Sequence, residues 1–398
     1  MSELRPFRAL RYSRDPGPRI APPYDVISAE ERAALAVELE NIVHLTLPPG
    51  SEGERDYSAA AQTFARWQQQ GVLVRDPEPL LYVLEERIPD GRIRRGFLGL
   101  LRLADYEERV VLPHERTMSG PKHDRLLLTR AVAANLEPLL FLYDDREATL
   151  APLLRPSAHG PTLMECRGPD GSQLALHAGP AGDGVAQVRS LLADRPVIIA
   201  DGHHRYETML GYRDECRRSG RDAARDDAHE FVLAYFVNAF DPGSRIDAIH
   251  RVLAGEVTDA GTALEGAGFR LEERSETTAE PLLELLAQRR KGAHAWVLVR
   301  RTGPCLLASR PRGVELDVEV LHAEVLPAIG GALSFDARAG RVIERVRSSD
   351  VALGILMNPL DPDELFSVVQ AGRVLPQKST FFSPKVPSGL VIRDLGKD

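Results

Sequence analysis

Short apolar runs alternate with amphipathic stretches along most of the chain, which is the pattern of an α/β protein. The apolar or alternating runs that predict strands or buried segments are residues 6–10, 80–87, 94–103, 138–143, 196–200, 231–239, 295–300, 351–357 and 389–392. The stretches with helical spacing begin near residue 28 and otherwise cover 57–70, 122–135, 203–218 and 279–290. We therefore predict an α/β (α+β) fold with a mixed sheet.

Local signals support several of these boundaries. Ser28 and Glu31 have the spacing of a capping box, and Gly71 follows the predicted helix as a stop signal. Asp90-Gly91 between two strand-like runs predicts a hairpin turn. Three arginines, at positions 92, 94 and 95, follow that turn, and we interpret them as solvated hairpin charge.

The order of these segments suggests three regions. Residues 1–254 form the expected core, and residues 255–345 a smaller α/β lobe. Residues 346–398 are expected to supply strands and a loop that return to the core.

Composition narrows the class of protein. No run of about 18 apolar residues is present, so no segment is expected to span a bilayer. The first residues lack the apolar core of a signal peptide, and three scattered cysteines form neither a disulfide framework nor a metal cluster. We expect a protein of the reducing cytoplasm. The formal net charge of −8 disfavours a nucleic-acid partner, because phosphate binding needs a basic face.

The strongest candidate site follows the apolar run 196–200. Asp201 and Gly202 end that run, and His203, His204 and Arg205 begin a helical stretch at once. We expect Asp201 to cap the helix and Gly202 to permit a sharp turn. The helix start favours an anion such as phosphate, Arg205 can grip it bidentately, and a histidine can move a proton near neutral pH. Capped, solvated polar residues are the alternative, and zinc is disfavoured for lack of spaced ligands.

Three further groups of residues are candidates. His114-Glu115 can serve as an acid–base pair or offer a carboxylate to a divalent ion, and Lys122, Asp124 and Arg125 follow it closely. The alternative is a helix entry with ion pairs.

The second group is Tyr24-Asp25, which follows two prolines that stiffen its loop. The third group is Lys378-Ser379-Thr380, which resembles the end of a phosphate-binding P-loop without its glycine-rich half. Each also fits a simple polar turn.

Together these motifs resemble a bacterial family known as domain of unknown function 1015. The likeness rests on the segments 22–27, 114–125, 200–207, 357–359 and 376–382, so it spans nearly the whole chain. That family implies no firm activity.

A second, shorter likeness suggests an activity. Residues 201–205, Asp-Gly-His-His-Arg, are similar to the signature of ADP-dependent free-serine kinases, which share a fold with ParB nucleotide-binding domains and sulfiredoxin. The likeness implies a ParB/sulfiredoxin-like core with an additional C-terminal lobe. It also implies that Asp201, His203, His204 and Arg205 handle phosphate and metal, the metal being Mg²⁺ or Mn²⁺ on Asp201. Glu115 is our candidate for the separate catalytic carboxylate; the sulfiredoxin cysteine is not matched.

The resulting hypothesis is phosphoryl transfer on a small hydroxy-amino acid, most simply serine or phosphoserine, with ADP or ATP as the nucleotide. Asp201, His204, Glu115 and His114 are the catalytic candidates. Phosphate contacts are assigned to the group Gly202, His203, Arg205, Lys378, Ser379 and Thr380, and substrate positioning to Tyr24, Asp25, Lys122 and Arg125. Three alternatives stay open: a phosphoserine phosphatase, a nucleotide-binding regulatory protein without turnover, and a ParB-like nucleic-acid-associated protein.

Overall fold

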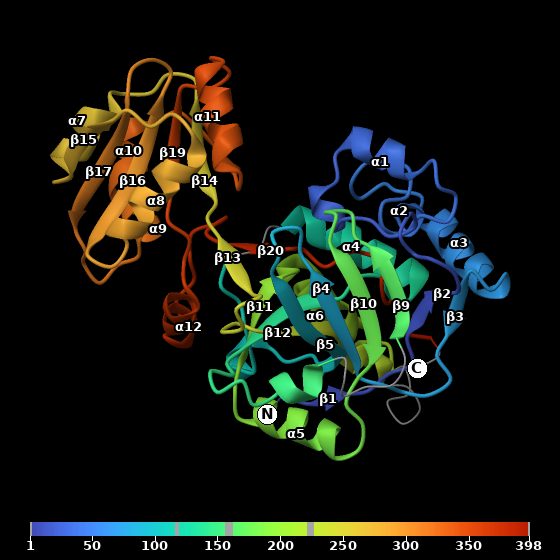
Figure 1. Ribbon diagram of the computed structural model, residues 1–398. Helices are drawn as coiled ribbons and strands as arrows, with labels where there is room; N and C mark the ends of the chain where they lie inside the picture. The colour runs from blue at the N-terminus through green and yellow to red at the C-terminus, as the bar shows by residue number, and fades with distance from the viewer. Residues whose placement is uncertain (1, 116–118, 156–161, 221–226, 397–398) are drawn as a thin grey trace. The chain divides into compact units, whose positions relative to one another are not determined.

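The computed structural model describes residues 2–115, 119–155, 162–220 and 227–396. The chain divides into two compact units (Figure 1). Unit 1 comprises Met1–Pro113, Thr117–Arg245 and Pro384–Asp398, and unit 2 comprises His114–Arg116 and Ile246–Ser383. Unit 2 is therefore inserted into unit 1, and the residues after Ser383 return to unit 1. The segment 346–383, which we expected to return to the core, belongs to unit 2, including the Lys378–Thr380 loop.

A mixed sheet forms the centre of unit 1. Its strands, in spatial order, are β6 (Val111–Leu112), β11 (Val197–Asp201), β8 (Leu139–Tyr143), β12 (Phe231–Asn238), β5 (Ile93–Arg102), β4 (Tyr82–Arg87), β10 (Gln173–Ala178) and β9 (Thr162–Arg167), with β1 (Leu4–Arg5) paired to β5. The pairs β11–β6 and β12–β8 are parallel, and the other pairs are antiparallel. The predicted mixed α/β fold is confirmed.

The helices of unit 1 are α1 (Ala29–Leu35), α2 (Val43–Thr46), α3 (Tyr57–Gln69), α4 (Ser119–Val132), α5 (Asp183–Ala193) and α6 (His203–Arg218). Short 3-10 turns lie at Tyr24–Val26, Tyr106–Glu108, Ala151–Leu154 and Ala228–Glu230. Two small strand pairs complete the unit: β2 (Leu10–Tyr12) with β3 (Leu73–Arg75), and β7 (Ala134–Asn135) with β21 (Arg393–Asp394). The capping box of Ser28 and Glu31 is present at α1.

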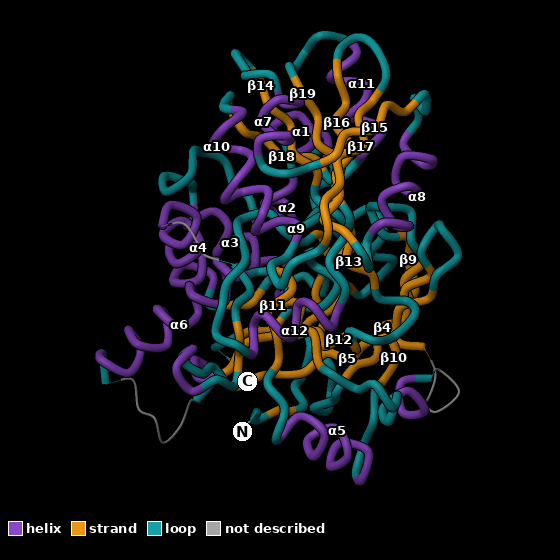
Figure 2. Tube along the Cα trace, turned by 90° about the vertical axis from the view of Figure 1, so that its left-hand side faces the viewer, coloured by secondary structure: helices purple, strands orange, loops and turns teal. Residues whose placement is uncertain are grey.

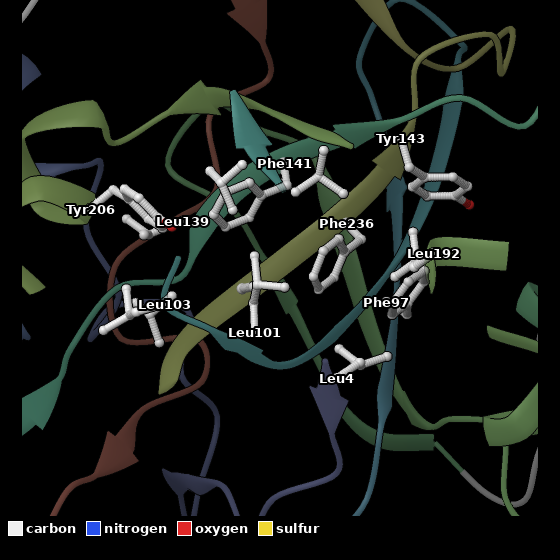
Figure 3. Packing of buried hydrophobic residues seen from close by; sticks show 14 of the residues in the cluster. Leu4, Phe97, Leu101, Leu103, Leu139, Phe141, Tyr143, Leu192, Tyr206 and Phe236 are labelled. Atoms are coloured by element: carbon white, nitrogen blue, oxygen red, sulfur yellow. The ribbon is translucent and has the colours of Figure 1, made fainter. Parts of the chain in front are cut away.

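Aliphatic and aromatic side chains pack together in the core of unit 1 (Figure 3). Phe236 on β12 stacks on Phe97 at 4.9 Å and on Phe141 at 5.6 Å, measured between ring centroids. Tyr206 of α6 packs edge-on against Phe141, and its hydroxyl donates to the carbonyl of Ala104 at 2.7 Å. These contacts hold the first turn of α6 against β8 and the residues that follow β5.

Unit 2 contains an antiparallel sheet of its own. The strands run β15 (Arg270–Arg274), β17 (Cys305–Pro311), β16 (Ala293–Arg300), β19 (Leu353–Met357), β14 (His250–Ala254) and β18 (Ala332–Asp336), as Figure 2 shows for the central strands. The helices are α7 (Ala260–Gly266), α8 (Ala279–Arg289), α9 (Asp317–Val320), α10 (Leu326–Ile329), α11 (Ala339–Arg347) and α12 (Pro362–Gln370), with a π turn at Leu321–Val325. Helices α8 and α11 pack on β16 and β19. Strand β13 (Arg245–Asp247) pairs with β20 (Phe381–Ser383).

Two sequence interpretations are wrong. Arg94 is not a solvated hairpin charge: it is 2% exposed on β5 and forms a bidentate ion pair with Glu86 across the hairpin. Residues 389–392 do not form a strand but a turn that ends in an isolated bridge between Ile392 and Leu10, because Gly389 adopts a positive φ. Across the described residues, no helix is long and apolar enough to cross a membrane.

Candidate functional site

The strongest candidate site lies where β11 ends and α6 begins. Strand β11 is an apolar, buried run that leads into Asp201, and Gly202 follows with φ +98°. A Cβ added at Gly202 would lie 2.6 Å from Cδ2 of Leu139, so both the backbone angle and the close approach require glycine. The sharp turn that we predicted for Gly202 is confirmed, and α6 starts at His203 as predicted.

Asp201 does not cap this helix, contrary to our expectation. The N-cap residue is Gly202, which has no side chain to offer, and no side-chain hydrogen bond caps the helix. The Asp201 carboxylate binds two cations instead of the helix N–H groups. Lys385 Nζ contacts its Oδ1, and Arg205 Nη2 donates to its Oδ2 at 2.7 Å. Helix α6 therefore presents an N-terminus without a side-chain cap, next to a carboxylate bridged by a lysine and an arginine.

Arg205 connects Asp201 to a second carboxylate. Its Nη1 lies 3.2 Å from Glu137 Oε2 and donates to the carbonyl of Pro138 at 3.1 Å. Glu137 Oε1 also accepts from the Ser388 hydroxyl and from the backbone N–H of Tyr24. We call Asp201, Arg205, Lys385 and Glu137 the Asp201 cluster; each of these four side chains is less than 20% exposed.

The charges of the Asp201 cluster shift one another's acidity. Burial alone would raise the pKa of Asp201, but the charges of Lys385 and Arg205 lower it to about 2. Burial opposes the charged forms of Arg205 and Lys385, and the surrounding carboxylates nevertheless raise the pKa of both. All three groups are therefore charged at neutral pH.

The Tyr24 loop borders the Asp201 cluster. Tyr24 lies under the guanidinium of Arg125, 4.2 Å from ring centroid to Cζ, and burial raises the pKa of its hydroxyl. Asp25 is exposed, and its charge raises the pKa of both Arg205 and Lys385. Arg125 is buried and donates to Asp124 and to the carbonyl of Thr46. The loop thus contributes an exposed carboxylate within the electrostatic range of both cations.

The other predicted residues of unit 1 have separate partners. Lys122 of α4 bonds Glu207 of α6 at 2.7 Å and so joins the two helices. His203 is buried, and its charge is one of the influences that lower the pKa of Asp201. His204 is partly exposed on the first turn, and its carbonyl accepts from the Thr208 hydroxyl at 2.7 Å.

The remaining candidates come together in unit 2. His114 is buried, and its Nε2 lies 2.7 Å from the Thr380 hydroxyl. Glu115 accepts from the backbone N–H of Lys378 at 3.2 Å. The side chain of Lys378 is exposed, and its φ is +57°. Ser379 is buried and donates to the carbonyl of Pro376 at 2.5 Å. Position 117 lies outside the described residues.

In unit 2 the His114-Glu115 segment contacts the Lys378–Thr380 loop, so two motifs that lie far apart in the sequence meet. Their assignment to the same reaction as Asp201, which belongs to unit 1, stays a prediction.

Sequence reasoning missed two members of the Asp201 cluster, Glu137 and Lys385. Glu137 is a carboxylate set between apolar residues just before β8, and Lys385 stands between Pro384 and Pro387. A charged residue isolated in an apolar or proline-rich segment is a weak sequence signal of a buried ion pair. In both of these cases the charged side chain does have a buried partner.

The donor set of the Asp201 cluster does not fit a resident divalent ion in this arrangement. Each carboxylate oxygen of Asp201 is bonded to a cation, and Glu137 is shared by Arg205, Ser388 and Tyr24. Within the described ranges, no three His, Cys, Asp or Glu side chains are grouped so that they could hold a metal. The assignment of Mg²⁺ or Mn²⁺ to Asp201 stays a prediction.

Fold and site together define a mixed α/β protein with a buried, charged cluster at a strand–turn–helix junction. Residues 4–319 match the family described as "Protein of unknown function (DUF1015)", and the chain belongs to this family. The search of curated proteins finds no match.

Solved structures give distant likenesses. A mutant free serine kinase in complex with AMP is 12% identical, with a TM-score of 0.38, and the match covers 72% of this chain and 86% of that one. A conserved hypothetical protein from Pyrococcus furiosus is 16% identical, with a TM-score of 0.37 and coverage of 75% and 95%. SbnI with a C-terminal truncation from Staphylococcus aureus is 13% identical, with a TM-score of 0.41 and coverage of 76% and 90%. At such TM-scores these likenesses carry no conclusion about function.

Proposed function

We propose that the Asp201 cluster and the N-terminus of α6 bind the phosphate of a nucleotide, and that the protein transfers a phosphoryl group between the nucleotide and the hydroxyl of a small hydroxy-amino acid, most simply serine. One observation carries the proposal: Arg205 and Lys385 meet at Asp201, beside the start of a 16-residue helix that no side chain caps. Helix N–H groups, a guanidinium and an ammonium are the groups that stabilise charge on a moving phosphoryl group.

The low pKa of Asp201 determines when its carboxylate can accept a proton in this reaction. While Lys385 and Arg205 hold its carboxylate, Asp201 is a poor proton acceptor. A bound phosphate would compete for both cations, and the weaker contacts with Asp201 together with the negative charge of the phosphate would raise the pKa of Asp201 toward its ordinary value. Phosphate binding would thereby activate the carboxylate in the same step that supplies the reactive group.

The transfer balances without any other reactant. The serine oxygen forms a bond to the terminal phosphorus, the bond from that phosphorus to the nucleotide's bridging oxygen breaks, and the hydroxyl proton passes to the Asp201 carboxylate. We assign Asp25, the exposed carboxylate beside both cations, to positioning the substrate. Glu115 remains the alternative base. A divalent ion that accompanies the nucleotide would belong to the substrate, because Mg²⁺ commonly binds through phosphate oxygens.

The test combines binding and turnover. Purified protein is incubated with L-serine and either ADP or ATP, with and without Mg²⁺, and both phosphoserine and nucleotide are measured. Phosphoserine alone is supplied in parallel, and phosphate release is measured. Formation of phosphoserine at the expense of one nucleotide is expected. Phosphate release from phosphoserine without a nucleotide would assign a phosphatase instead, and nucleotide binding with no product would assign a regulatory protein.

Matched variants locate the activity. Arg205→Gln and Lys385→Gln should each weaken nucleotide binding by about 1.5–3 kcal/mol, the contribution of one charge-assisted contact. Arg217→Gln removes the same charge from the far end of α6, where Arg217 pairs with Glu230, and should leave binding unchanged. Asp201→Asn should abolish turnover. Unchanged nucleotide affinity in both cluster variants would place the nucleotide elsewhere.

A further inference from the structure

Unit 2 contains a small polar pocket that the proposed function does not use. Its volume of about 20 Å³ exceeds the space that one buried water molecule needs. Its lining includes Arg251, Arg290, Arg312, Asp317, Asn358 and Glu364. Asn358 and its neighbours Met357 and Pro359, which also line the pocket, form one of the motifs by which the chain resembles its family.

Arg251 is a buried cation that faces no carboxylate. It is 1% exposed, and no ion pair joins it to an acidic residue in the described part of the chain. Its Nε and Nη2 both lie near Nε2 of His322, at 3.2 and 3.1 Å, and its Nη1 donates to the carbonyl of Ile249. Burial lowers the pKa of Arg251 to about 10, and burial together with Arg251 lowers that of His322 to about 4. At neutral pH a charged guanidinium is thus held by a neutral imidazole and a backbone carbonyl.

These contacts leave part of the guanidinium unsatisfied. Arginine has five N–H donors, and the contacts above engage three of them. Two donors therefore have no partner among the described residues. A buried charge with spare donors is costly unless something else supplies acceptors.

Asp317 lines the same pocket and has an unpaired acceptor, whereas Arg251 has unpaired donors. Its Oδ1 accepts from Nδ1 of His294 at 2.9 Å, and the backbone N–H of Gly313 donates to the other ring nitrogen at 3.0 Å, which fixes the hydrogen on Nδ1. Its Oδ2 is buried and has no hydrogen-bond partner. Burial raises the pKa of Asp317 against the opposing influence of His294 and Arg312. The pocket thus offers an unpaired acceptor as well as unpaired donors.

The other charged groups of the pocket are already paired. Arg290 lies 3.1 Å from both Asp361 and Glu364, and Arg312 contacts Glu364 and the carbonyl of Arg290. Among the charged residues described in this lining, Arg251 and Asp317 are therefore the two with unmet hydrogen-bonding capacity. One ligand that satisfies both must carry an anionic acceptor and a cationic donor close together.

We propose that this pocket binds the backbone end of a free α-amino acid, with the carboxylate on Arg251 and the ammonium on Oδ2 of Asp317. The enclosed volume admits only the charged end of such a molecule, so its side chain would extend toward the mouth. This site is independent of the nucleotide site proposed for unit 1. A single water molecule that bridges the two groups is the competing explanation.

Hydrogen exchange resolved by segment tests the proposal on the whole protein. The probes are glycine and L-alanine, which have no hydroxyl to accept a phosphoryl group. Acetate and methylammonium each carry only one of the two charged groups and serve as half-ligands. Glycine and L-alanine should slow exchange around residues 312–318 and 357–364, whereas each half-ligand at the same concentration should not. Residues 197–207, at the Asp201 cluster, should not respond, so failure of one site is distinguishable from failure of the other.

Three variants complete the test. Asp317→Asn keeps the shape and the bond from His294 but removes the charge, and Arg251→Lys keeps the charge but removes the planar donor pair. Each should weaken glycine binding about tenfold or more, the loss expected for one charge-assisted hydrogen bond. Arg338→Gln is the control, because that side chain of unit 2 is 71% exposed and is not part of the pocket lining.

If the Arg251→Lys variant fails to fold, glycine binding by the Asp317→Asn variant tests the proposal. Absence of protection by glycine and L-alanine would overturn the proposal in favour of a bound water. Equal protection by acetate alone, or binding unaffected by Asp317→Asn, would also overturn it.

Discussion

Arg205 in unit 1 and Arg251 in unit 2 are both buried arginines at a candidate site, yet their surroundings differ in kind. Arg205 faces two carboxylates, Asp201 at 2.7 Å and Glu137 at 3.2 Å. Arg251 faces a neutral imidazole, a backbone carbonyl and, at 5.3 Å, the ring of Phe335. The neighbouring carboxylates raise the pKa of Arg205, whereas burial lowers that of Arg251.

The two arginines would therefore select different kinds of ligand. In the Asp201 cluster, a ligand has to compete with internal carboxylates, so only a strongly charged group such as phosphate gains from entering. In the Arg251 pocket no internal ion pair has to be broken, so a weaker, zwitterionic group can add hydrogen bonds that the protein lacks. Burial alone therefore does not indicate the function of an arginine, because its hydrogen-bond and ion-pair partners determine which ligand it can bind.

A third buried arginine, Arg94, gives the reference for a fully paired charge. It donates to Glu86 at 2.5 and 2.8 Å, and the Tyr235 hydroxyl donates to the same carboxylate. Arg94→Met should lower the free energy of unfolding by about 3–5 kcal/mol, because Glu86 would be left buried without its cation. Urea unfolding measures the loss. Adding Glu86→Leu to the variant should recover most of it, and failure to recover would assign the loss to packing.

Gly202 sets the geometry of the Asp201 cluster, and Gly202→Ala should cost about 3 kcal/mol from the left-handed backbone angle together with steric overlap. The added methyl group would lie 2.6 Å from Leu139 and 3.1 Å from Nη2 of Arg205. Gly220→Ala is the matched control at the other end of α6, since φ is +65° there and nothing lies within 4 Å of the added Cβ. Equal losses for the two variants would show that the contact with Leu139 is unimportant.

The Asp201 cluster should also make stability depend on pH. The pKa of Asp201 is lowered from 3.8 to about 2 in the folded protein, so the folded state favours the ionised carboxylate. Its contribution, about 2 kcal/mol, is present above the unfolded pKa and is lost as the pH falls from about 4 to about 2. Other carboxylates titrate in the same range, so the measured quantity is the difference between wild type and Asp201→Asn. A difference that stays constant from pH 6 to about pH 2 would contradict the ion pairs.

Arg251→Met should have the smallest effect, within about 1 kcal/mol, because no carboxylate is left behind and a costly buried charge is removed. The same substitution at Arg94 and at Arg251 thus separates a paired from an unpaired buried arginine. Thermal unfolding of the two variants, side by side, measures the contrast. A loss at Arg251 as large as that at Arg94 would mean that its bonds to His322 and Ile249 are structural.

Features that depend on neighbours in sequence could be predicted. The β11–Gly202–α6 junction follows from an apolar run, a glycine and a helical period, and the β4–β5 hairpin follows from its Asp90-Gly91 turn. The pairing of Arg94 with Glu86 was also readable, because that turn places Glu86 opposite Arg94 and Glu85 opposite Arg95. Our interpretation of the arginines as solvated charge overlooked this register.

Features that depend on the order of strands could not be predicted. Glu137 reaches Arg205 because β8 lies next to β11, and nothing local to Glu137 specifies that neighbour. Lys385 is 184 residues from Asp201 along the chain. The same limit applies to Arg251 and Asp317, which line one pocket from separate parts of unit 2.

The return of residues 384–398 to unit 1 has a consequence for protein synthesis. Because the ribosome makes the chain from its N-terminus, all of unit 2 emerges before Lys385 can reach Asp201. Until then a nascent unit 1 holds Asp201 and Arg205 without the lysine that completes their charge balance. Residues made after unit 2 are therefore needed to complete the site, and a polypeptide released before Lys385 would carry an incomplete one.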